Sequence, residues 1–506
     1  MPSESVPDHE RSPFRLDRCP DPVPLRRALE EAGYTESSIS KTVLMDDSGQ
    51  PMDLAAVLHR TAAASPYNTL IRLFVLGRPV SEEAVRNALA PAGLEELAAP
   101  GLIKLEEEHV RAEAALIPYG DLILLRDFWP SFLGQPAAKN HVPGVGQASQ
   151  AVANMTVRMQ VESALDLGTG MGYQAILAAR HADRVMGTDT NPRALNFAAI
   201  NARLNDLTGI EFRRGSLYEP VAECRFDLIV SNPPFVISPR ADHEYRDGSL
   251  SGDAFSEQVI CGAPEFLREG GYCTILFNWY HQNEDDWADR PTKWVKSGGC
   301  DAWIVRFDTV DPINYASSWL DHVRDDEPEH YDRLLDEWLA YYDRLGIGLI
   351  SLGAVVLRRR SGPSNWIRAE EEPAQQPSSS SSDQIRRIFA NQDLLEKLDA
   401  DTDLLDNSFA LAPGHQLEQV LKAKEGRWNV EGAQLKQTRG IPFVGNVDRL
   451  ISTVLAGCDG THPLRELVDD LATGLNMESE QIAPACTLVI RRLLESGFLT
   501  VSTDAE

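Results

Sequence analysis

The sequence predicts an α/β fold with a parallel, doubly wound sheet in the middle of the chain, and three observations support it. Apolar runs of strand length alternate with helical segments between about residues 160 and 360. The first run ends in the glycine-rich turn 168–172, which precedes a helix. The fourth run ends in the tetrad Asn232-Pro233-Pro234-Phe235, and paired prolines can end a buried strand.

Length and charge limit the classes of protein that need to be considered. The chain has 506 residues, which corresponds to about three domains at roughly 150 residues each. It carries 48 Lys+Arg against 76 Asp+Glu, a formal net charge of −28. A net basic surface is needed to coat nucleic acid electrostatically, so the charge argues against that class but leaves room for a local basic patch.

The cysteines and the apolar runs predict a cytoplasmic protein with no membrane segment. The seven cysteines are scattered and form no C-x-x-C, which suits reduced thiols better than a disulfide framework or a zinc site. The N-terminal MPSESVPDHERSPF is polar, unlike a signal peptide, and no run reaches about 18 apolar residues. No cluster with metal-ligand spacing is recognised, so we expect no metal.

Composition divides the chain into four parts. The stretch 363–385 contains an acidic triplet and five consecutive serines, which predicts a flexible linker. Prolines and glycines cluster again between 130 and 145. The predicted parts are an N-terminal recognition domain (1–135), a central catalytic domain (136–362), the linker and a C-terminal domain (386–506).

Both flanks are predicted to be mainly helical and winged-helix-like. In the first, Leu25, Ala28 and Leu29 share a helical face, helices follow at 52–63 and 66–76, and Ser81 can cap another. The alternation of Val110, Ala112, Ala114 and Leu116 predicts one strand, with LILLRDF as its hairpin partner.

The second flank shows a comparable pattern. Short strands are predicted in FALAPG, RWNVEGAQLKQ and FLTV. Helical stripes lie at 447–455, with Asn446 as a cap, and at 464–471, and a third helix is predicted to end at Gly497. A stabilising or oligomerising role explains this flank as well as a recognition role does.

The ends of the first three central strands carry candidate ligand-binding groups. Asp166 ends the first strand, and the glycines after it allow a tight turn and a close approach of backbone to a ligand. A dinucleotide site would have its third glycine at position 173, where this chain has Tyr. Asp189 ends the second strand and can accept both hydroxyls of a ribose, and Ser216 ends the third.

The tetrad 232–235 supplies groups that suit a planar NH2. A rigid turn would hold the Asn232 side chain and the Pro233 carbonyl at the carboxyl edge of the sheet, where both can accept hydrogen bonds. Phe235 offers a face on which a flat group can stack. These two hydrogen-bond acceptors lie next to an aromatic ring in the sequence. The tetrad therefore predicts a site that binds a planar amino group.

With D-L-G-T-G-M-G, T-D-T-N-P and S-N-P-P-F in this order, the chain resembles the class I S-adenosylmethionine-dependent methyltransferases, in the amino-group branch with N-P-P-[FY]. The resemblance covers about 141–360 and implies a Rossmann-like seven-stranded sheet. It implies that S-adenosylmethionine is the cofactor and that Asn232 and Pro233 orient the target nitrogen while Phe235 stacks on the target. The implied cofactor residues are Asp166, Gly168, Thr169, Gly170, Gly172, Asp189, Ser216 and Asn232.

One position departs from the family pattern. The family usually has Asp at the end of the third strand, where it accepts from the adenine amino group, and this chain has Ser216. Either Ser216 or a neighbouring backbone group would make that contact. This departure leaves open a non-catalytic module that only binds the cofactor.

Two further segments are candidates for lining the site. The stretch 140–158, before the first strand, can fold over the cofactor, although His141 within it is better explained as a loop residue without a catalytic role. The aromatic-rich insertion 311–346 can line a substrate channel, although a helical cover with its aromatic side chains packed inward explains it better.

The resemblance implies N-methylation of a macromolecule, with protein glutamine and a nucleobase of RNA or DNA nearly equal as targets. The acidic balance favours protein, whereas winged-helix-like flanks and the run Arg358-Arg359-Arg360 favour nucleic acid. A peptide or small-molecule acceptor is the alternative.

Overall fold

The computed structural model describes residues 14–44, 52–248, 250–324, 328–362, 364–371, 377–398, 400–424 and 426–501. It forms two compact units. The first comprises Met1–Gln150, Met159–Ile304 and Thr309–Arg368, and the second comprises Ala151–Arg158, Val305–Asp308 and Ala369–Glu506. The predicted N-terminal and central domains therefore belong to a single unit.

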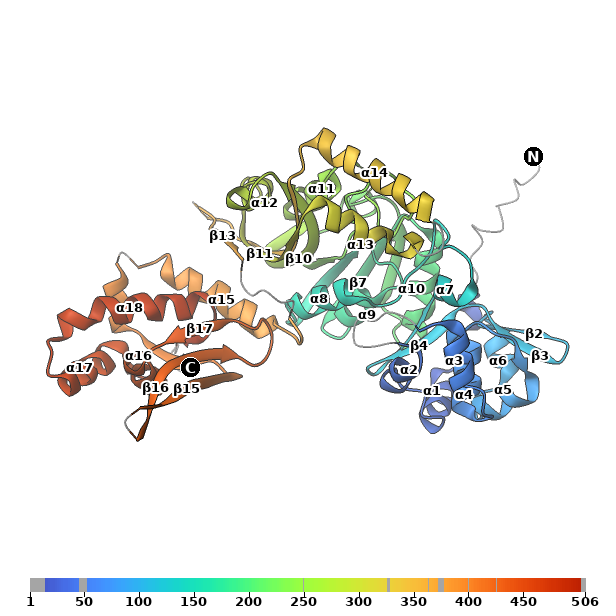
Figure 1. The fold of residues 1–506 in the computed structure, drawn as a ribbon, viewed down its shortest axis with the longest axis horizontal. Helices are drawn as coiled ribbons and strands as arrows, with labels where there is room; N and C mark the ends of the chain where they lie inside the picture. Colours follow the sequence, from blue (N-terminus) through green and yellow to red (C-terminus); the bar gives the residue numbers. More distant parts are fainter. Residues whose placement is uncertain are drawn as a thin grey trace. The chain divides into compact units, whose positions relative to one another are not determined.

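The central sheet confirms the predicted α/β class, with eight strands in the order β13-β11-β12-β10-β9-β6-β7-β8 (Figure 1). The strands β8, β7, β6, β9 and β10 run parallel, and β12 runs antiparallel to β10. The eighth strand, β13, occupies the edge beside β11, so the count of seven was wrong by one edge strand. The bounds are β6 Val161–Leu167, β7 Ala182–Asp189, β8 Ile210–Arg214, β9 Phe226–Ser231, β10 Leu267–His281, β11 Cys300–Val310, β12 Leu349–Arg359 and β13 Ile367–Glu370.

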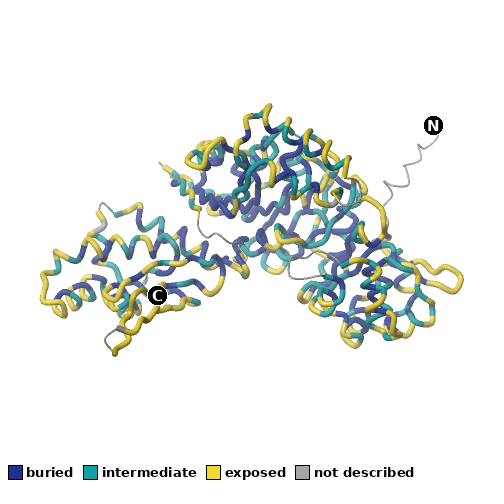
Figure 2. Tube along the Cα trace, in the orientation of Figure 1, coloured by how far each residue is buried: buried dark blue, intermediate teal, exposed yellow. Residues whose placement is uncertain are grey.

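The helices between the first strands of the sheet in chain order include α9 Tyr173–Ala178, α10 Pro192–Leu204, α11 Ala254–Phe266 and α12 Asp289–Val295. The start of α10 follows from its sequence, because Pro192 occupies the first turn and the Asn191 side chain accepts from Arg193 N. The strands of the sheet are mostly buried, as the dark blue in Figure 2 shows. No helix in the described ranges combines the length and apolar character that crossing a bilayer requires.

The N-terminal part of this unit is mainly helical, with the three-stranded sheet β1-β3-β2 and a β4–β5 hairpin. Two expectations were wrong in detail: the predicted strand through Val110 and Leu116 is two strands, and the Ser81 side chain makes no capping hydrogen bond. The elements are α1 Pro22–Glu31, α2 Glu36–Val43, α3 Leu54–Arg60, α4 Pro66–Leu70, a π-helical turn Ile71–Val75, β1 Val80–Ser81, α5 Glu82–Leu89, α6 Leu94–Ala98, β2 Ile103–Glu106, β3 His109–Ala112, β4 Ala115–Tyr119, β5 Leu122–Arg126 and α7 Pro130–Leu133.

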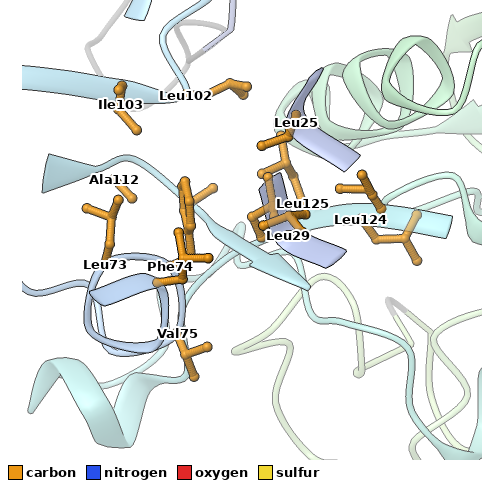
Figure 3. Packing of buried hydrophobic residues seen from close by; sticks show 14 of the residues in the cluster. Leu25, Leu29, Leu73, Phe74, Val75, Leu102, Ile103, Ala112, Leu124 and Leu125 are labelled. Carbon is orange, nitrogen blue, oxygen red and sulfur yellow. The ribbon is translucent and has the colours of Figure 1, made fainter. Parts of the chain in front are cut away.

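A shared core and a buried amide join this part to the central sheet. Leu25 and Leu29 of α1 lie beside Leu124 and Leu125 of β5 in a cluster that also includes residues of α9 and α10 (Figure 3). The fully buried Asn201 of α10 exchanges hydrogen bonds with the Leu125 backbone and donates to Met171 O. The N-terminal hairpin is thereby fixed to the glycine-rich turn.

The insertion 311–346 forms two helices, α13 Pro312–Arg324 and α14 Pro328–Leu345, which pack side by side (Figure 1). Tyr315, Trp338 and Tyr342 are buried in the cluster between them. The interpretation as a helical cover with inward aromatic side chains is confirmed.

The second unit contains two three-stranded sheets, β18-β14-β19 and β15-β16-β17. Gly497 follows the last helix with φ +72°, as predicted, but the cap of α16 is Asp448, which accepts from Ile451 N, and not Asn446. The winged-helix assignment of both flanks stays a prediction. The elements are α15 Ser382–Leu395, β14 Ser408–Leu411, β15 His415–Lys424, β16 Arg427–Gln437, β17 Val444–Val447, α16 Arg449–Ala456, β18 Asp459–Pro463, α17 Leu464–Leu475, α18 Ser479–Glu495 and β19 Leu499–Val501.

The predicted linker 363–385 contains regular structure at both ends. Residues 367–370 form β13, and α15 begins at Ser382, whose hydroxyl accepts from Arg158 N. Residues 363 and 372–376 lie outside the described residues. The serine run was therefore wrongly assigned to a flexible segment at its C-terminal end, because Ser381 and Ser382 bond to neighbouring backbone.

Candidate active site

A cavity of about 360 Å³ lies at the carboxyl ends of β6, β7, β8 and β9. Four segments line it: the stretch before β6 (residues 139–149, called the upstream stretch), the glycine-rich turn, the strand ends and the loop after the tetrad. This is the edge where doubly wound sheets bind ligands. The lining includes Lys139, His141, Pro143, Gly144, Ser149, Asp166, Gly168, Thr169, Gly170, Asp189, Ser216, Asn232, Pro233, His243, Glu244 and Tyr245.

The carboxylate of Asp166 fixes the glycine-rich turn. It is buried, and its Oδ2 accepts from Thr169 Oγ1 at 2.7 Å and from Ala175 N at 2.9 Å. Burial raises the pKa of Asp166 to about 7, against the two hydrogen bonds that favour its charged form. Gly172 has φ +90°, and a Cβ there would lie 3.0 Å from the Ala198 backbone, so the turn requires glycine at this position.

The carboxylate of Asp189 contacts the same turn from the end of β7. Its Oδ2 accepts from Gly170 N and its Oδ1 from Asn191 N, both at 2.9 Å. Burial raises its pKa. The end of β7 and the glycine-rich turn are therefore held together through this carboxylate on the cavity wall.

Ser216 lies two residues beyond the end of β8, because the strand stops at Arg214 rather than at the predicted position. It is exposed and lines the cavity together with Gly215 and Leu217. The geometry brings it to the site, and its contact with an adenine stays a prediction.

Asn232 presents a polar atom that needs a partner. Its Nδ2 donates to Ser149 Oγ at 3.1 Å, whereas its Oδ1 is buried and accepts no hydrogen bond within the described part of the chain. Buried acceptors are nearly always paired in native proteins. An acceptor oxygen left over on a cavity wall therefore indicates a place for a ligand donor.

Phe235 lies outside the set of residues that line the cavity. It is half-buried against the α13–α14 cluster and is absent from the cavity lining, whereas Pro233 and Pro234 line it. The reason is local, because β9 ends at Ser231 and the rigid prolines carry the next residue past the edge of the sheet. The stacking of Phe235 on the target stays a prediction.

Several lining residues carry no signal in the sequence. Ser149 reaches Asn232 from α8 (Gln147–Met155), and Gln174 Nε2 donates to Ser149 O at 2.7 Å. His243, Glu244 and Tyr245 lie in a loop without a recognised motif. His141, which precedes β6, lines the cavity, and burial lowers its pKa.

The run Arg358-Arg359-Arg360 is not a free basic patch. Arg358 and Arg360 both bond the buried carboxylate of Asp301, and Arg359 donates to Gly298 O and Pro264 O. Burial alone would raise the pKa of Asp301, but the two guanidiniums hold it below its ordinary value. The run therefore serves the fold, and the prediction of a local basic patch at these arginines is wrong.

The cavity fits S-adenosylmethionine in size and in chemistry. Its volume lies in the range of roughly 300–1,000 Å³ of small-molecule sites. A Cβ added at Gly168 or Gly170 would meet no protein atom within 4 Å, so the backbone of this turn is open to a ligand. The carboxylate of Asp189 lines the cavity, and its contact with ribose hydroxyls stays a prediction. No group of three metal-ligating side chains occurs among the described residues.

Comparisons with known proteins agree with this geometry. Residues 143–286 match the methyltransferase small domain family, and residues 51–113 and 386–501 match two domains of unknown function, DUF7059 and DUF7782. A release factor glutamine methyltransferase of Xylella fastidiosa (strain 9a5c) is 34% identical over 190 residues. A ribosomal protein uL3 glutamine methyltransferase of Bradyrhizobium diazoefficiens is 29% identical over 195 residues.

These alignments cover 34% and 35% of this chain and 66% and 60% of the two relatives, so the chain spans two thirds of their lengths or less. Among solved structures, the YcgJ protein from Bacillus subtilis aligns with a TM-score of 0.29 and 12% identity, over 42% of this chain and 98% of that chain. The motifs, the cavity and the family match agree. The central domain is a class I S-adenosylmethionine-dependent methyltransferase domain that resembles the protein-glutamine N5-methyltransferases.

Proposed function

We propose that this protein transfers a methyl group from S-adenosylmethionine to the planar NH2 of a macromolecule, and that the acceptor is a glutamine side chain of a protein. The observation that carries the proposal is the buried, unsatisfied Oδ1 of Asn232 on the cavity wall. An amide NH2 supplies the donor that this oxygen lacks. The assignment of Asn232 and Pro233 as acceptor-orienting residues is part of this proposal.

The residues of the chain have separate roles. Asp166 holds the turn that receives the methionine moiety, and Asp189 holds the ribose. When bound, S-adenosylmethionine would supply a methyl group on a cationic sulfur; the sulfur–carbon bond would break as the carbon–nitrogen bond forms, leaving a neutral thioether, and one proton of the methylated nitrogen would pass to water. Asn232 Oδ1 accepts from the target NH2, which aims the nitrogen lone pair and favours the tetrahedral transition state.

Charge supports a protein acceptor over a nucleobase. Glu244 lies on the cavity wall, and the arginines 358–360 are engaged with the fold. The N-terminal β2–β3 hairpin carries Glu106, Glu107 and Glu108 at its turn. These carboxylates would repel a phosphate backbone. The relatives named above are glutamine methyltransferases, which supports the same choice.

The experiment uses cells in which the gene has been disrupted, because their acceptor is unmethylated. Their extract is incubated with the purified chain and S-adenosylmethionine carrying a radioactive methyl group, and portions are digested with protease or with nuclease. We expect label in the protease-sensitive fraction and N5-methylglutamine after hydrolysis of the labelled protein. Label in the nuclease-sensitive fraction would assign a nucleobase instead, and label in neither would indicate a small acceptor.

Asn232→Ala is the matched control for catalysis. It should abolish the labelling while leaving the affinity for S-adenosylmethionine in calorimetry nearly unchanged. Undiminished labelling by this variant would show that the tetrad is only structural.

The proposed cytoplasmic location is supported by seven cysteines that are all free in this structure.

A further inference from the structure

The loop after the tetrad returns to it and is fixed there. Val236 N donates to Arg246 O at 3.0 Å, and Val236 forms a bridge with Asp247. A turn closes this return, because Asp247 N donates to His243 O and His243 N donates to Asp247 Oδ2, both at 2.9 Å. The segment 243–247 is therefore held beside the tetrad by backbone and side-chain bonds.

Two further contacts anchor this turn from outside. Arg246 Nε pairs with the buried Asp247 Oδ1 at 2.8 Å, and the guanidinium lies 5.6 Å from the ring of Trp319 on α13. On the other side, Glu244 N donates to Lys139 O at 3.1 Å. The turn thus connects the helical cover to the upstream stretch, and its backbone position is determined on both sides of Tyr245.

Tyr245 faces the cavity that also contains Asn232 and Pro233. Its ring centroid lies 5.7 Å from that of His141 and 5.6 Å from that of His243. It retains 39% of its surface exposed. These contacts hold the ring at the wall and leave part of it uncovered.

Among the described residues, three Phe and Tyr rings line the cavity, namely Tyr173, Tyr245 and Phe255. Tyr173 and Phe255 are half-buried, because Tyr173 meets Tyr119 edge to face at 5.4 Å and Phe255 packs against a hydrophobic core cluster. Phe235 lies outside the cavity lining, against the α13–α14 cluster. Of the three lining rings, Tyr245 is the exposed one.

We propose that Tyr245 supplies the flat face on which the planar acceptor group stacks, in place of Phe235. This inference rests on the proposed function and assigns it a substrate-contacting residue. A ring face attracts an amide or a base without needing a particular hydrogen-bond pattern. Stacking removes water from one side of the acceptor and limits its rotation, so that its NH2 stays directed at Asn232 Oδ1.

The test compares two leucine variants that each remove one ring and keep an apolar side chain. Tyr245→Leu and Phe235→Leu are assayed for transfer of labelled methyl to the extract described above, and calorimetry measures their affinity for S-adenosylmethionine. Loss of one stacked group corresponds to roughly tenfold or more in rate. We expect Tyr245→Leu to lose at least about tenfold, with unchanged cofactor affinity, and to lose much more than Phe235→Leu.

Tyr245→Phe keeps the ring and should restore transfer, and thermal unfolding of each variant checks that it is folded. The inference is overturned if Tyr245→Leu transfers as well as the wild type, if Phe235→Leu loses more, or if Tyr245→Phe fails to restore transfer. A fall in cofactor affinity that equals the fall in transfer would assign Tyr245 to the cofactor and also overturn it. If the wild type itself labels nothing, the proposed function fails, and this inference fails with it.

Discussion

The side chain of Asn232 donates from Nδ2 to the hydroxyl of Ser149 at 3.1 Å. Ser149 belongs to α8, which precedes the first strand of the sheet, and its carbonyl accepts from Gln174 at the start of α9. The amide that is proposed to aim the acceptor is thus held by a helix from another part of the chain, which is itself attached to the glycine-rich turn. In the described part of the chain, Asn232 Oδ1 is the end of this amide that accepts no hydrogen bond.

Removing the Ser149 hydroxyl should loosen the Asn232 amide. A neutral hydrogen bond contributes about 1 kcal/mol, so Ser149→Ala should lower methyl transfer by roughly three- to tenfold, with cofactor affinity unchanged. Ser149→Thr keeps the hydroxyl and should retain most of the rate. Transfer rates and calorimetry decide this, and equal rates for Ser149→Ala and the wild type would show that the contact is dispensable.

The carboxylate of Asp189 should determine cofactor affinity. Hydrogen bonds to a charged group contribute about 1.5–3 kcal/mol, so Asp189→Ala should weaken S-adenosylmethionine binding by roughly 10- to 100-fold in calorimetry. Asp183→Ala is the matched control, because Asp183 is an exposed residue on the same strand. If the two variants bind equally, Asp189 only holds the turn through Gly170.

The buried carboxyl of Asp166 should make stability depend on pH. Its pKa is raised from 3.8 to about 7 by burial, so the folded state binds more protons than the unfolded state between these values. Its contribution to folding is therefore intact below about pH 4, decreases as the pH rises to about 7, and is constant above that. Asp166→Asn, which cannot ionise, should lack this dependence.

Chemical denaturation of the wild type and Asp166→Asn from pH 4 to pH 8 measures this effect. The free energy of unfolding of the variant should rise relative to the wild type across that window and then level off. A constant difference between the two proteins over the whole range would show that Asp166 does not titrate there.

The two glycines of the turn should differ in their tolerance of a side chain. Both have positive φ, which costs a residue with a Cβ about 1–2 kcal/mol. At Gly168 a Cβ meets no protein atom within 4 Å, but at Gly172 it lies 3.0 Å from the Ala198 backbone. Gly172→Ala should therefore reduce the free energy of unfolding by about 1 kcal/mol more than Gly168→Ala does. Denaturation without cofactor tests this difference, and equal losses would mean that α10 moves to accommodate the methyl.

The sequence alone predicted the features that depend on residues adjacent to one another in the chain. Asp166, Asp189, two glycines of the turn (Gly168 and Gly170) and the paired prolines of the tetrad belong to local patterns, and all of them line one cavity. Gly172, which was predicted with them, is not among the lining residues. Their order in a doubly wound sheet follows from the alternation of strands and helices. Local patterns therefore predicted the fold class and the position of Asn232, and the cofactor followed from the family resemblance that these motifs carry.

Contacts between distant residues were decided only by tertiary structure. Asp301 pairs with both Arg358 and Arg360 from a strand more than fifty residues earlier, which local charge counting cannot detect. The same holds for Ser149 beside Asn232 and for the returning turn that brings Tyr245 to the site while the prolines carry Phe235 away. A local pattern fixes which backbone turn forms, whereas the position of each side chain depends on which distant surfaces pack against that turn.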